Sequence, residues 1–296
     1  MRAVWSFWSA PFFAHYESRW LSHKHHLLAW ALSFKTASQH YPDTALVTDT
    51  AGARLLVDGL GLEFGSVDLR LDSLVAEGRD VDWWVLGKLT AYEAQTRPFV
   101  HLDNDVFLWR PLPEAMTAAP VFAQNPEGFE FTDQSLYRLE AFMAGVADAD
   151  GWLPPEWRVY AQARRTGAVC CGILGGQDVA FLRRYAALAI AVIVHPRNQR
   201  VWPGLGVRDN ILVEQYFLAA CIASRQASRG LPSADFQPAY LFPSPAEAFE
   251  PAHAAAAGYT HLIGEAKVDA EIADRLERRV RADYPDLHAR CVLHAG

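Results

Sequence analysis

Short apolar segments alternate with longer segments of helical periodicity through the first hundred residues. Residues 3–7, 45–48 and 99–102 predict buried strands, whereas residues 20–39 and 83–95 carry apolar side chains at helical spacing. Such alternation is typical of βαβ units, whose strands run parallel and whose helices cover both faces of the sheet. We therefore predict an α/β fold, a single Rossmann-like domain with a mostly parallel central sheet flanked by helices.

The second half of the chain is less regular. Residues 168–174 and 259–263 predict further strands, and residues 178–194 and 209–223 predict further helices. Residues 125–165 are rich in Pro, Gly and acidic side chains and have weak periodicity. We expect an irregular excursion there.

The closing segment, residues 269–296, is expected to pack on the rest of the protein as an amphipathic helix. Ile272, Leu276 and Val280 fall on one helical stripe. Arg residues follow towards the end of this helix, where cations interact favourably with the helix dipole.

The charge and the apolar runs limit the classes of partner. The 296 residues carry a formal net charge of -7 without a block of Lys or Arg, which disfavours nucleic acid. The longest apolar run, residues 186–194, is well short of the ~20 residues that span a bilayer. We predict no integral membrane segment, and a small molecule or a glycan as the partner.

Cysteine usage favours a reducing compartment. Four cysteines lack metal-finger spacing, and the neighbours Cys170 and Cys171 are poorly placed to form a disulfide with each other. The aromatic-rich start, MRAVWSFWSAPFF, is a poor match to a signal peptide. We expect a cytoplasmic protein.

The segment PFVHLDNDVFLWRPLP carries the clearest chemical signal. An apolar strand delivers two carboxylates, Asp103 and Asp105, two positions apart at its end. If the chain turns there, both can reach one hard cation, which prefers oxygen ligands and commonly bridges carboxylates to phosphate. The alternative interpretation is a solvated acidic turn. The apolar stretches on both sides favour a metal site.

A second polar element, HLIGEAK, follows the late strand. Its imidazole, His261, is a good ligand for a borderline cation such as Mn²⁺. Gly264 allows the backbone to approach a phosphate, and Lys267 supplies a point charge. By itself this element also fits a strand-capping His and a surface Lys.

Together the two elements resemble the GT-A glycosyltransferases of the glycogenin and bacterial lipooligosaccharide galactosyltransferase type. The resemblance extends in looser form over most of the chain, which also looks like an uncharacterised bacterial group of presumed glycosyltransferases. It implies that Asp103, Asp105 and His261 ligate Mn²⁺ or Mg²⁺. Gly264 and Lys267 would then contact the diphosphate of a nucleotide-sugar donor, a UDP-sugar, with Asn104 in the same turn as a further donor contact.

The same resemblance implies a domain organisation. Residues 1–268 would form a GT-A-like catalytic domain, with a donor half over 1–125 and an acceptor half with its excursion over 126–268. Residues 269–296 would pack on it.

Further site residues follow from the resemblance. Lys88, in the segment GKLTAY, would contact the donor. Gly172 lies in CCGILGG, a segment similar to the family's strand near the sugar and the acceptor, although Cys170 stands where Asn is usual. Ser6 ends the first strand, where such folds hold the nucleobase. Asp49 after the second strand is either a ribose contact or a turn residue.

Asp209, Glu214 and Gln215 lie at or just inside a helix start, where related enzymes place polar groups beside the anomeric carbon and the acceptor. The alternative interpretations are an N-cap for Asp209 and a solvated helix residue for Glu214. The resemblance favours retention of the anomeric configuration, which needs no strong base. Inversion would require a carboxylate base, and Glu214 or Asp209 would be the first candidates.

Two other functions remain open. A haloacid-dehalogenase-like phosphatase also has Asp-x-Asp after a strand and would use Asp103 as the nucleophile. However, its motif normally lies near the N-terminus, with Thr or Val where Phe107 stands. A noncatalytic glycan-binding relative could use the many aromatic side chains as a sugar platform.

Three histidines, His23, His25 and His26, cluster near the start of the first long helix. No carboxylate or Cys at matching spacing completes a metal site. We interpret them as a polar helix face.

Overall fold

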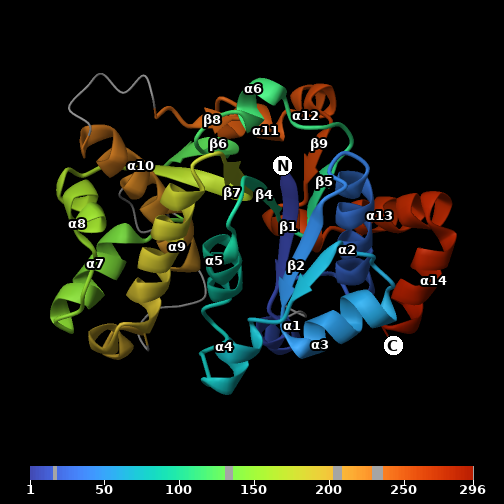
Figure 1. Ribbon diagram of the computed structural model, residues 1–296, viewed down its shortest axis with the longest axis horizontal. Coiled ribbons are helices and arrows are strands. Elements are labelled where there is room, and N and C mark those ends of the chain that lie inside the picture. The colour runs from blue at the N-terminus through green and yellow to red at the C-terminus, as the bar shows by residue number, and fades with distance from the viewer. Residues whose placement is uncertain (16–18, 131–135, 203–208, 229–235, 296) are drawn as a thin grey trace. The chain divides into compact units, whose positions relative to one another are not determined.

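The structure is a computed structural model that describes residues 1–15, 19–130, 136–202, 209–228 and 236–295. The protein is α/β, with mostly parallel strand pairing and helices beside the strands (Figure 1). Its contacts divide the chain into two compact units. The first comprises Met1–Val81, Val100–Leu112 and Pro251–Gly296, and the second comprises Asp82–Phe99 and Pro113–Glu250.

The strands of the first unit follow the order β3-β2-β1-β4. β1 (Arg2–Phe7) pairs in parallel with β2 (Thr44–Thr48), which pairs in parallel with β3 (Ser66–Asp68). β4 (Phe99–Leu102) is buried along its whole length. The strands predicted over residues 3–7, 45–48 and 99–102 are therefore confirmed.

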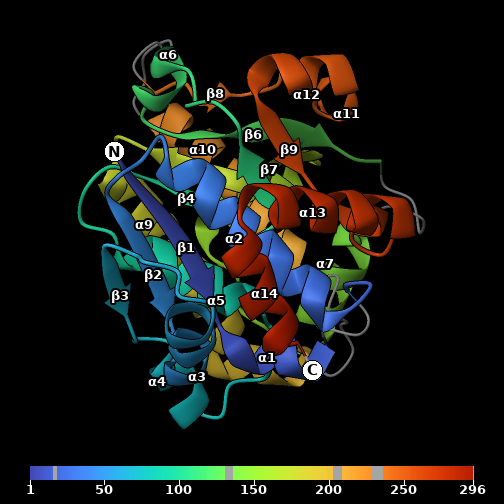
Figure 2. The same ribbon diagram turned by 90° about the vertical axis from the view of Figure 1, so that its right-hand side faces the viewer.

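Helices of the first unit come from both ends of the chain. α2 (His23–Ser38) packs against α13 (Ala270–Asp283) and α14 (Pro285–Leu293), and Figure 2 shows these two in front of it. The shorter elements are α1 (Ser9–His15), α3 (Thr50–Ala53), the π-helical η2 (Arg54–Gly59), α4 (Asp72–Ala76) and α12 (Pro251–Ala257).

The prediction of one closing helix is only partly right. Ala273, Leu276 and Val280 form the buried stripe of α13, but Tyr284 leaves helical geometry with φ -140°. Pro285 then begins α14, because proline fits the first turn of a helix and cannot continue one.

The second unit contains strands in the order β7-β6-β8. β6 (Phe122–Gly128) pairs antiparallel with β7 (Gly167–Gly176) and parallel with β8 (Ala239–Tyr240). Helix α9 (Val179–Val194) contacts β7 and α5 (Val85–Ala94). The remaining elements include α6 (Glu114–Thr117), η3 (Pro196–Arg200), α10 (Phe217–Ser228) and α11 (Pro245–Phe249).

The irregular excursion predicted over residues 125–165 is wrong for the residues described there. This segment holds the end of β6 and two helices, α7 (Leu139–Asp148) and α8 (Pro155–Gln162). Each helix is short and buries few side chains. Phe142 of α7 and Trp157 of α8 stack with ring centroids 5.0 Å apart, so tertiary packing supplies the order that the weak periodicity lacks.

The helix predicted over residues 209–223 is present in altered form. Residues Leu212–Tyr216 form a π-helical turn, η6, which continues into α10. Single π-helical turns are frequent at functional sites.

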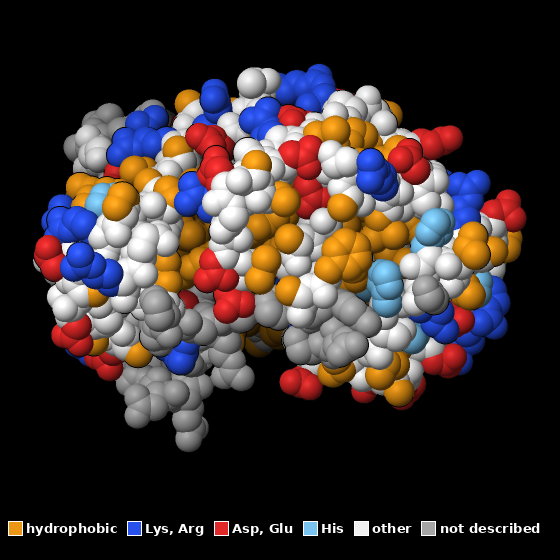
Figure 3. All heavy atoms as spheres, turned by 90° about the horizontal axis from the view of Figure 1, so that it is seen from below, with side chains coloured by type: hydrophobic (Ala, Val, Ile, Leu, Met, Phe, Trp, Pro, Cys, Tyr) orange, Lys and Arg blue, Asp and Glu red, His pale blue; other side chains and the backbone are white. Residues whose placement is uncertain are grey.

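Three bulk properties complete the description. Every described helix is too short or too polar to cross a bilayer. All four cysteines are buried, and none of them forms a disulfide. On the face drawn in Figure 3, acidic and basic side chains are interspersed.

Candidate metal centre

Asp103 and Asp105 lie in a tight turn between two buried strands of the first unit. β4 ends at Leu102, β5 (Val106–Leu108) begins after Asp105, and the Val106 amide donates to the Asp103 carbonyl at 3.1 Å. The apolar strands fix the turn, and the turn presents both carboxylates on the same side. This local geometry agrees with the prediction from the sequence.

Strand β9 (Tyr259–His261) brings the late polar element to this turn. It pairs antiparallel with β5, with Val106 opposite His261. Beyond the pair, the Leu262 amide donates to the Asp105 carbonyl at 2.9 Å. Backbone pairing thus sets His261 beside Asp105.

The resulting cluster contains Asp103, Asp105 and His261, with one ligand atom of each within 4.8 Å of the others. His261 Nε2 lies 3.5 Å from Asp105 Oδ1. Asp105 is 2% exposed, and its buried Oδ1 accepts no hydrogen bond from the described residues. Two carboxylates and an imidazole suit a borderline or hard divalent cation such as Mn²⁺ or Mg²⁺. The donor set therefore fits the predicted metal.

Lys267 Nζ lies 2.5 Å from Asp105 Oδ2. Burial by itself would raise the pKa of Asp105, but the Lys267 ammonium and the neighbouring His261 imidazole hold this pKa well below its usual range. Asp105 is therefore a carboxylate at neutral pH. The predicted phosphate contact Lys267 has a carboxylate partner within its own unit.

His101 is a member of the site that the sequence analysis missed. It lies on β4 two residues before Asp103, which follows the end of the strand. The Ser6 hydroxyl lies 2.9 Å from His101 Nε2, and His101 Nδ1 lies 3.8 Å from Asp103 Oδ1. A His within an otherwise apolar strand was the available signal. Ser6, predicted to bind the donor, reaches the cluster through this imidazole.

Two consecutive hydrogen bonds connect the turn to Ser33 and Trp5. Trp5 Nε1 donates to the Ser33 hydroxyl at 2.9 Å, and that hydroxyl donates to the Asp103 carbonyl at 3.2 Å. Residues of β1 and α2 thus hold the turn in place.

Gly264 and Asn104 keep their predicted places near the cluster. Gly264 begins the 3₁₀ helix η7 (Gly264–Lys267) with φ +56°, in the left-handed region that favours glycine. The buried Nδ2 of Asn104 donates to no described residue. Both remain predicted donor contacts.

Asp49 has a structural role. It is 1% exposed, and its carboxylate accepts from the Gly52 amide at 2.7 Å, the Ser9 amide at 2.8 Å and the Ser9 hydroxyl at 2.9 Å. The carboxylate therefore caps α3 and fixes the end of β1. Of the two interpretations left open, the contacts support the turn residue, and the ribose contact stays a prediction.

The interpretation of the early histidines as a polar helix face is wrong for His25 and His26. Both are buried, and the His26 ring stacks on Phe12 with centroids 4.0 Å apart. Burial lowers the pKa of His26 well below its usual value, so this imidazole is neutral. His26 is buried because it packs among the aromatic rings of Phe12, Trp20 and Trp30, although histidine is a polar residue.

The second unit holds its own buried polar cluster. Lys88 Nζ lies 2.7 Å from Glu214 Oε1, which also accepts from the Tyr92 hydroxyl at 3.1 Å. Glu214 lies on η6 and is 1% exposed, so it is not a solvated helix residue. Lys88, predicted to contact the donor, has Glu214 and the Cys171 carbonyl, at 3.3 Å, as neighbours.

The other predicted residues of this unit are also engaged. Arg138 Nη2 lies 2.7 Å from Asp209 Oδ2, and Asp209 is 1% exposed. The Tyr137 hydroxyl bridges Gln215 and Glu127 by short hydrogen bonds. Gly172 is buried within β7. The sequence analysis missed Arg138, Tyr137 and Glu127.

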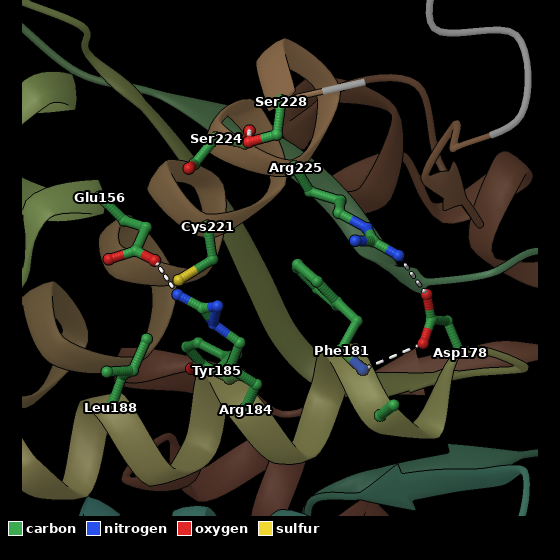
Figure 4. Close-up of a pocket in the computed structure, with 11 residues that line it drawn as sticks. Glu156, Asp178, Phe181, Arg184, Tyr185, Leu188, Cys221, Ser224, Arg225 and Ser228 are labelled. Carbon is green, nitrogen blue, oxygen red and sulfur yellow. Dashed lines mark hydrogen bonds and ion pairs between the residues drawn. The ribbon is translucent and has the colours of Figure 1, made fainter.

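A separate pocket of about 280 Å³ lies in the second unit between α8, α9 and α10. Figure 4 shows two ion pairs on its walls, Arg184 with Glu156 and Arg225 with Asp178. Phe181 and Cys221 add apolar surface. None of the predicted metal ligands lines it.

The fold and the site define an α/β protein with a carboxylate and imidazole cluster at the end of a buried strand. The family described as "Family of unknown function (DUF6734)" matches residues 1–293, and the chain belongs to this family. No curated protein matches the chain.

Proposed function

We propose that this protein is a metal-dependent glycosyltransferase that transfers a sugar from a nucleotide-diphosphate donor to a glycan or small-molecule acceptor. The observation that carries the proposal is the meeting of Asp103 and Asp105 with His261, which approach from distant parts of the chain to within 4.8 Å. A solvated acidic turn would need neither the buried Asp105 nor the paired strand that delivers the imidazole.

The three ligands would hold Mn²⁺ or Mg²⁺. When bound, the ion would supply positive charge where the diphosphate leaving group becomes more negative, a form of electrostatic stabilisation common in such enzymes. Lys267 and the backbone at Gly264 would bind the diphosphate oxygens, and Asn104 would complete the donor contacts. Ser6 would lie at the nucleobase end, and we propose uridine as the base.

The contacts of the second unit favour retention of the anomeric configuration. A base for inversion must be free to accept the acceptor proton. Glu214 is paired with Lys88, and Asp209 is paired with Arg138, and both carboxylates are buried. We propose that the bond between the anomeric carbon and the donor phosphate oxygen breaks and the nucleoside diphosphate leaves. The acceptor oxygen bonds to the anomeric carbon on the same face, and an oxygen of the leaving diphosphate takes the acceptor proton.

The four cysteines form no disulfide, which fits a reducing compartment. We therefore propose a cytoplasmic enzyme.

The proposal is tested by incubating the purified protein with UDP-sugars and Mn²⁺ and measuring UDP release. Slow hydrolysis is expected even without the acceptor, with loss on chelation and in Asp103→Asn. Undiminished release with a chelator present would overturn the metal-dependent function. Proton NMR of the earliest product reports the anomeric configuration.

Two other results would redirect the assignment. Turnover of a generic phosphomonoester with a covalent intermediate at Asp103 would identify a phosphatase. Glycan binding without release of nucleotide from any donor would identify a noncatalytic relative.

A further inference from the structure

Asp105 is both the ion-pair partner of Lys267 and a proposed ligand of the metal. The Lys267 ammonium lies 2.5 Å from Asp105 Oδ2, and the Asp105 side chain is only 3% exposed. A buried carboxylate keeps its charge because a cation accompanies it. A divalent cation on the same carboxylate would stand a few ångströms from the ammonium, where like charges repel strongly.

Residues near the N-terminus, Trp20 and Leu21, contact Lys267 and fix its position. The Leu21 amide donates to the Lys267 carbonyl at 3.0 Å, which fixes its backbone. Its ammonium lies 5.5 Å from the centre of the Trp20 ring, a cation–π distance. Trp20 is 6% exposed and packs edge-on against His26 at 5.5 Å.

Because His26 is neutral, it adds no positive charge beside this ammonium. The aromatic face of Trp20 and the Asp105 carboxylate together form a defined position for the Lys267 side chain. Four rotatable side-chain bonds also allow Lys267 to leave this position for a nearby anion.

We propose that Lys267 is the counter-ion of Asp105 when no donor is bound, and that its ammonium moves to the diphosphate when the donor binds. The inference rests on the proposed function for the identity of the anion. It implies that the metal binds weakly by itself and tightly together with the diphosphate. By linkage, the metal strengthens diphosphate binding by the same factor.

The test is a titration of Mn²⁺, followed by electron paramagnetic resonance, into the wild-type protein and Lys267→Met, with and without UDP. Without UDP, Lys267→Met is expected to bind Mn²⁺ about tenfold more tightly, within the range by which groups around metal ligands alter affinity. With UDP, the wild-type affinity is expected to rise, and that of the variant to rise much less.

Two further variants separate charge from folding. Lys267→Arg keeps the charge and is expected to bind Mn²⁺ as weakly as the wild type. Lys267→Gln keeps a donor to Asp105 and is expected to follow Lys267→Met, so the comparison survives if the methionine variant fails to fold. Lys24→Met is the matched control, because Lys24 pairs with Glu277, which is not a predicted ligand. Its Mn²⁺ affinity is expected to be unchanged.

Unchanged or weaker Mn²⁺ binding by folded Lys267→Met and Lys267→Gln, without UDP, would overturn the competition. If both variants gain affinity but UDP has no effect on the wild type, the competition stands and the nucleotide-sugar function fails. Equal enhancement by UDP in the wild type and in Lys267→Met would overturn the transfer of Lys267 to the diphosphate.

Discussion

Lys88 Nζ lies 2.7 Å from Glu214 Oε1 in the interior of the second unit, where the two side chains are 10% and 1% exposed. The carboxylate also accepts from Tyr92, and the backbone carbonyl of Glu214 accepts from the Tyr185 hydroxyl at 2.6 Å. The ion pair therefore links α5 to the π-helical turn. Its members depend on each other, because a buried charge is stable only with a partner.

Replacing Lys88 by Met should destabilise the protein strongly. The substitution leaves Glu214 without its cation, and losing one partner of a buried pair costs about 3–5 kcal/mol. Urea denaturation measures the change. The double variant Lys88→Met/Glu214→Leu should recover much of the loss, since no charge remains buried. Arg278→Met, which breaks an exposed ion pair with Asp274, should change stability by about 0.5 kcal/mol or less. Equal effects for the buried and exposed pairs would contradict this account.

Glu277 should make stability depend on acidic pH. Its carboxylate contacts Lys24 at 2.6 Å, Arg281 at 2.8 Å and His288 at 3.2 Å, and His25 lies 3.8 Å away. The hydrogen bond from Lys24, followed by those from His288 and Arg281, lowers the pKa of Glu277 from 4.5 to about 2.

Because the folded pKa lies below the unfolded value, the stabilisation is present above pH 4.5 and is lost as the pH falls towards 2. Thermal unfolding between these pH values should show a steeper loss of Tm for the wild type than for Glu277→Gln. Parallel curves for the two proteins would remove Glu277 as the cause.

The two aspartates of the turn should respond differently to amide substitution. The Asp103 side chain is 24% exposed, so Asp103→Asn should keep the fold and lower Mn²⁺ affinity by at least about tenfold, since changes even around metal ligands have this effect. Asp105→Asn leaves Lys267 and His261 without their buried carboxylate and should also lower the free energy of unfolding.

Calorimetric titration with Mn²⁺ and urea denaturation separate these two effects. Wild-type Mn²⁺ affinity in Asp103→Asn would exclude Asp103 as a ligand.

Gly264→Ala should cost about 1–2 kcal/mol through its backbone alone, because φ is +56° and no heavy atom would contact the added Cβ within 4 Å. Gly78 is a matched control, with φ +63° and the same open surroundings, and Gly128→Ala tests open space without the positive φ. All three variants can be compared by urea denaturation. Only Gly264→Ala should also weaken binding of UDP with Mn²⁺, and an equal loss in Gly78→Ala would exclude a local role.

Properties that depend on neighbouring residues could be predicted from the sequence. The apolar run before Asp103 specifies a buried strand, and the two carboxylates at its end specify a polar turn, because both depend on residues a few positions apart. By contrast, residues 139–148 and 155–162 form helices that their weak periodicity did not indicate. The stacking of Phe142 on Trp157 stabilises these two helices against each other.

The tertiary structure decided which of these elements meet. Pairing of β5 with β9 placed His261 at Asp105, and packing against Phe12 made His26 a neutral core residue. Folding also brought Lys88 to the carboxylate of Glu214 and Lys267 to the carboxylate of Asp105. A charged side chain has no preferred partner along the sequence, since its energy depends on burial and on the charges that folding brings near. The sequence therefore determined the Asp103–Asp105 turn, and folding determined that His261 and Lys267 contact it.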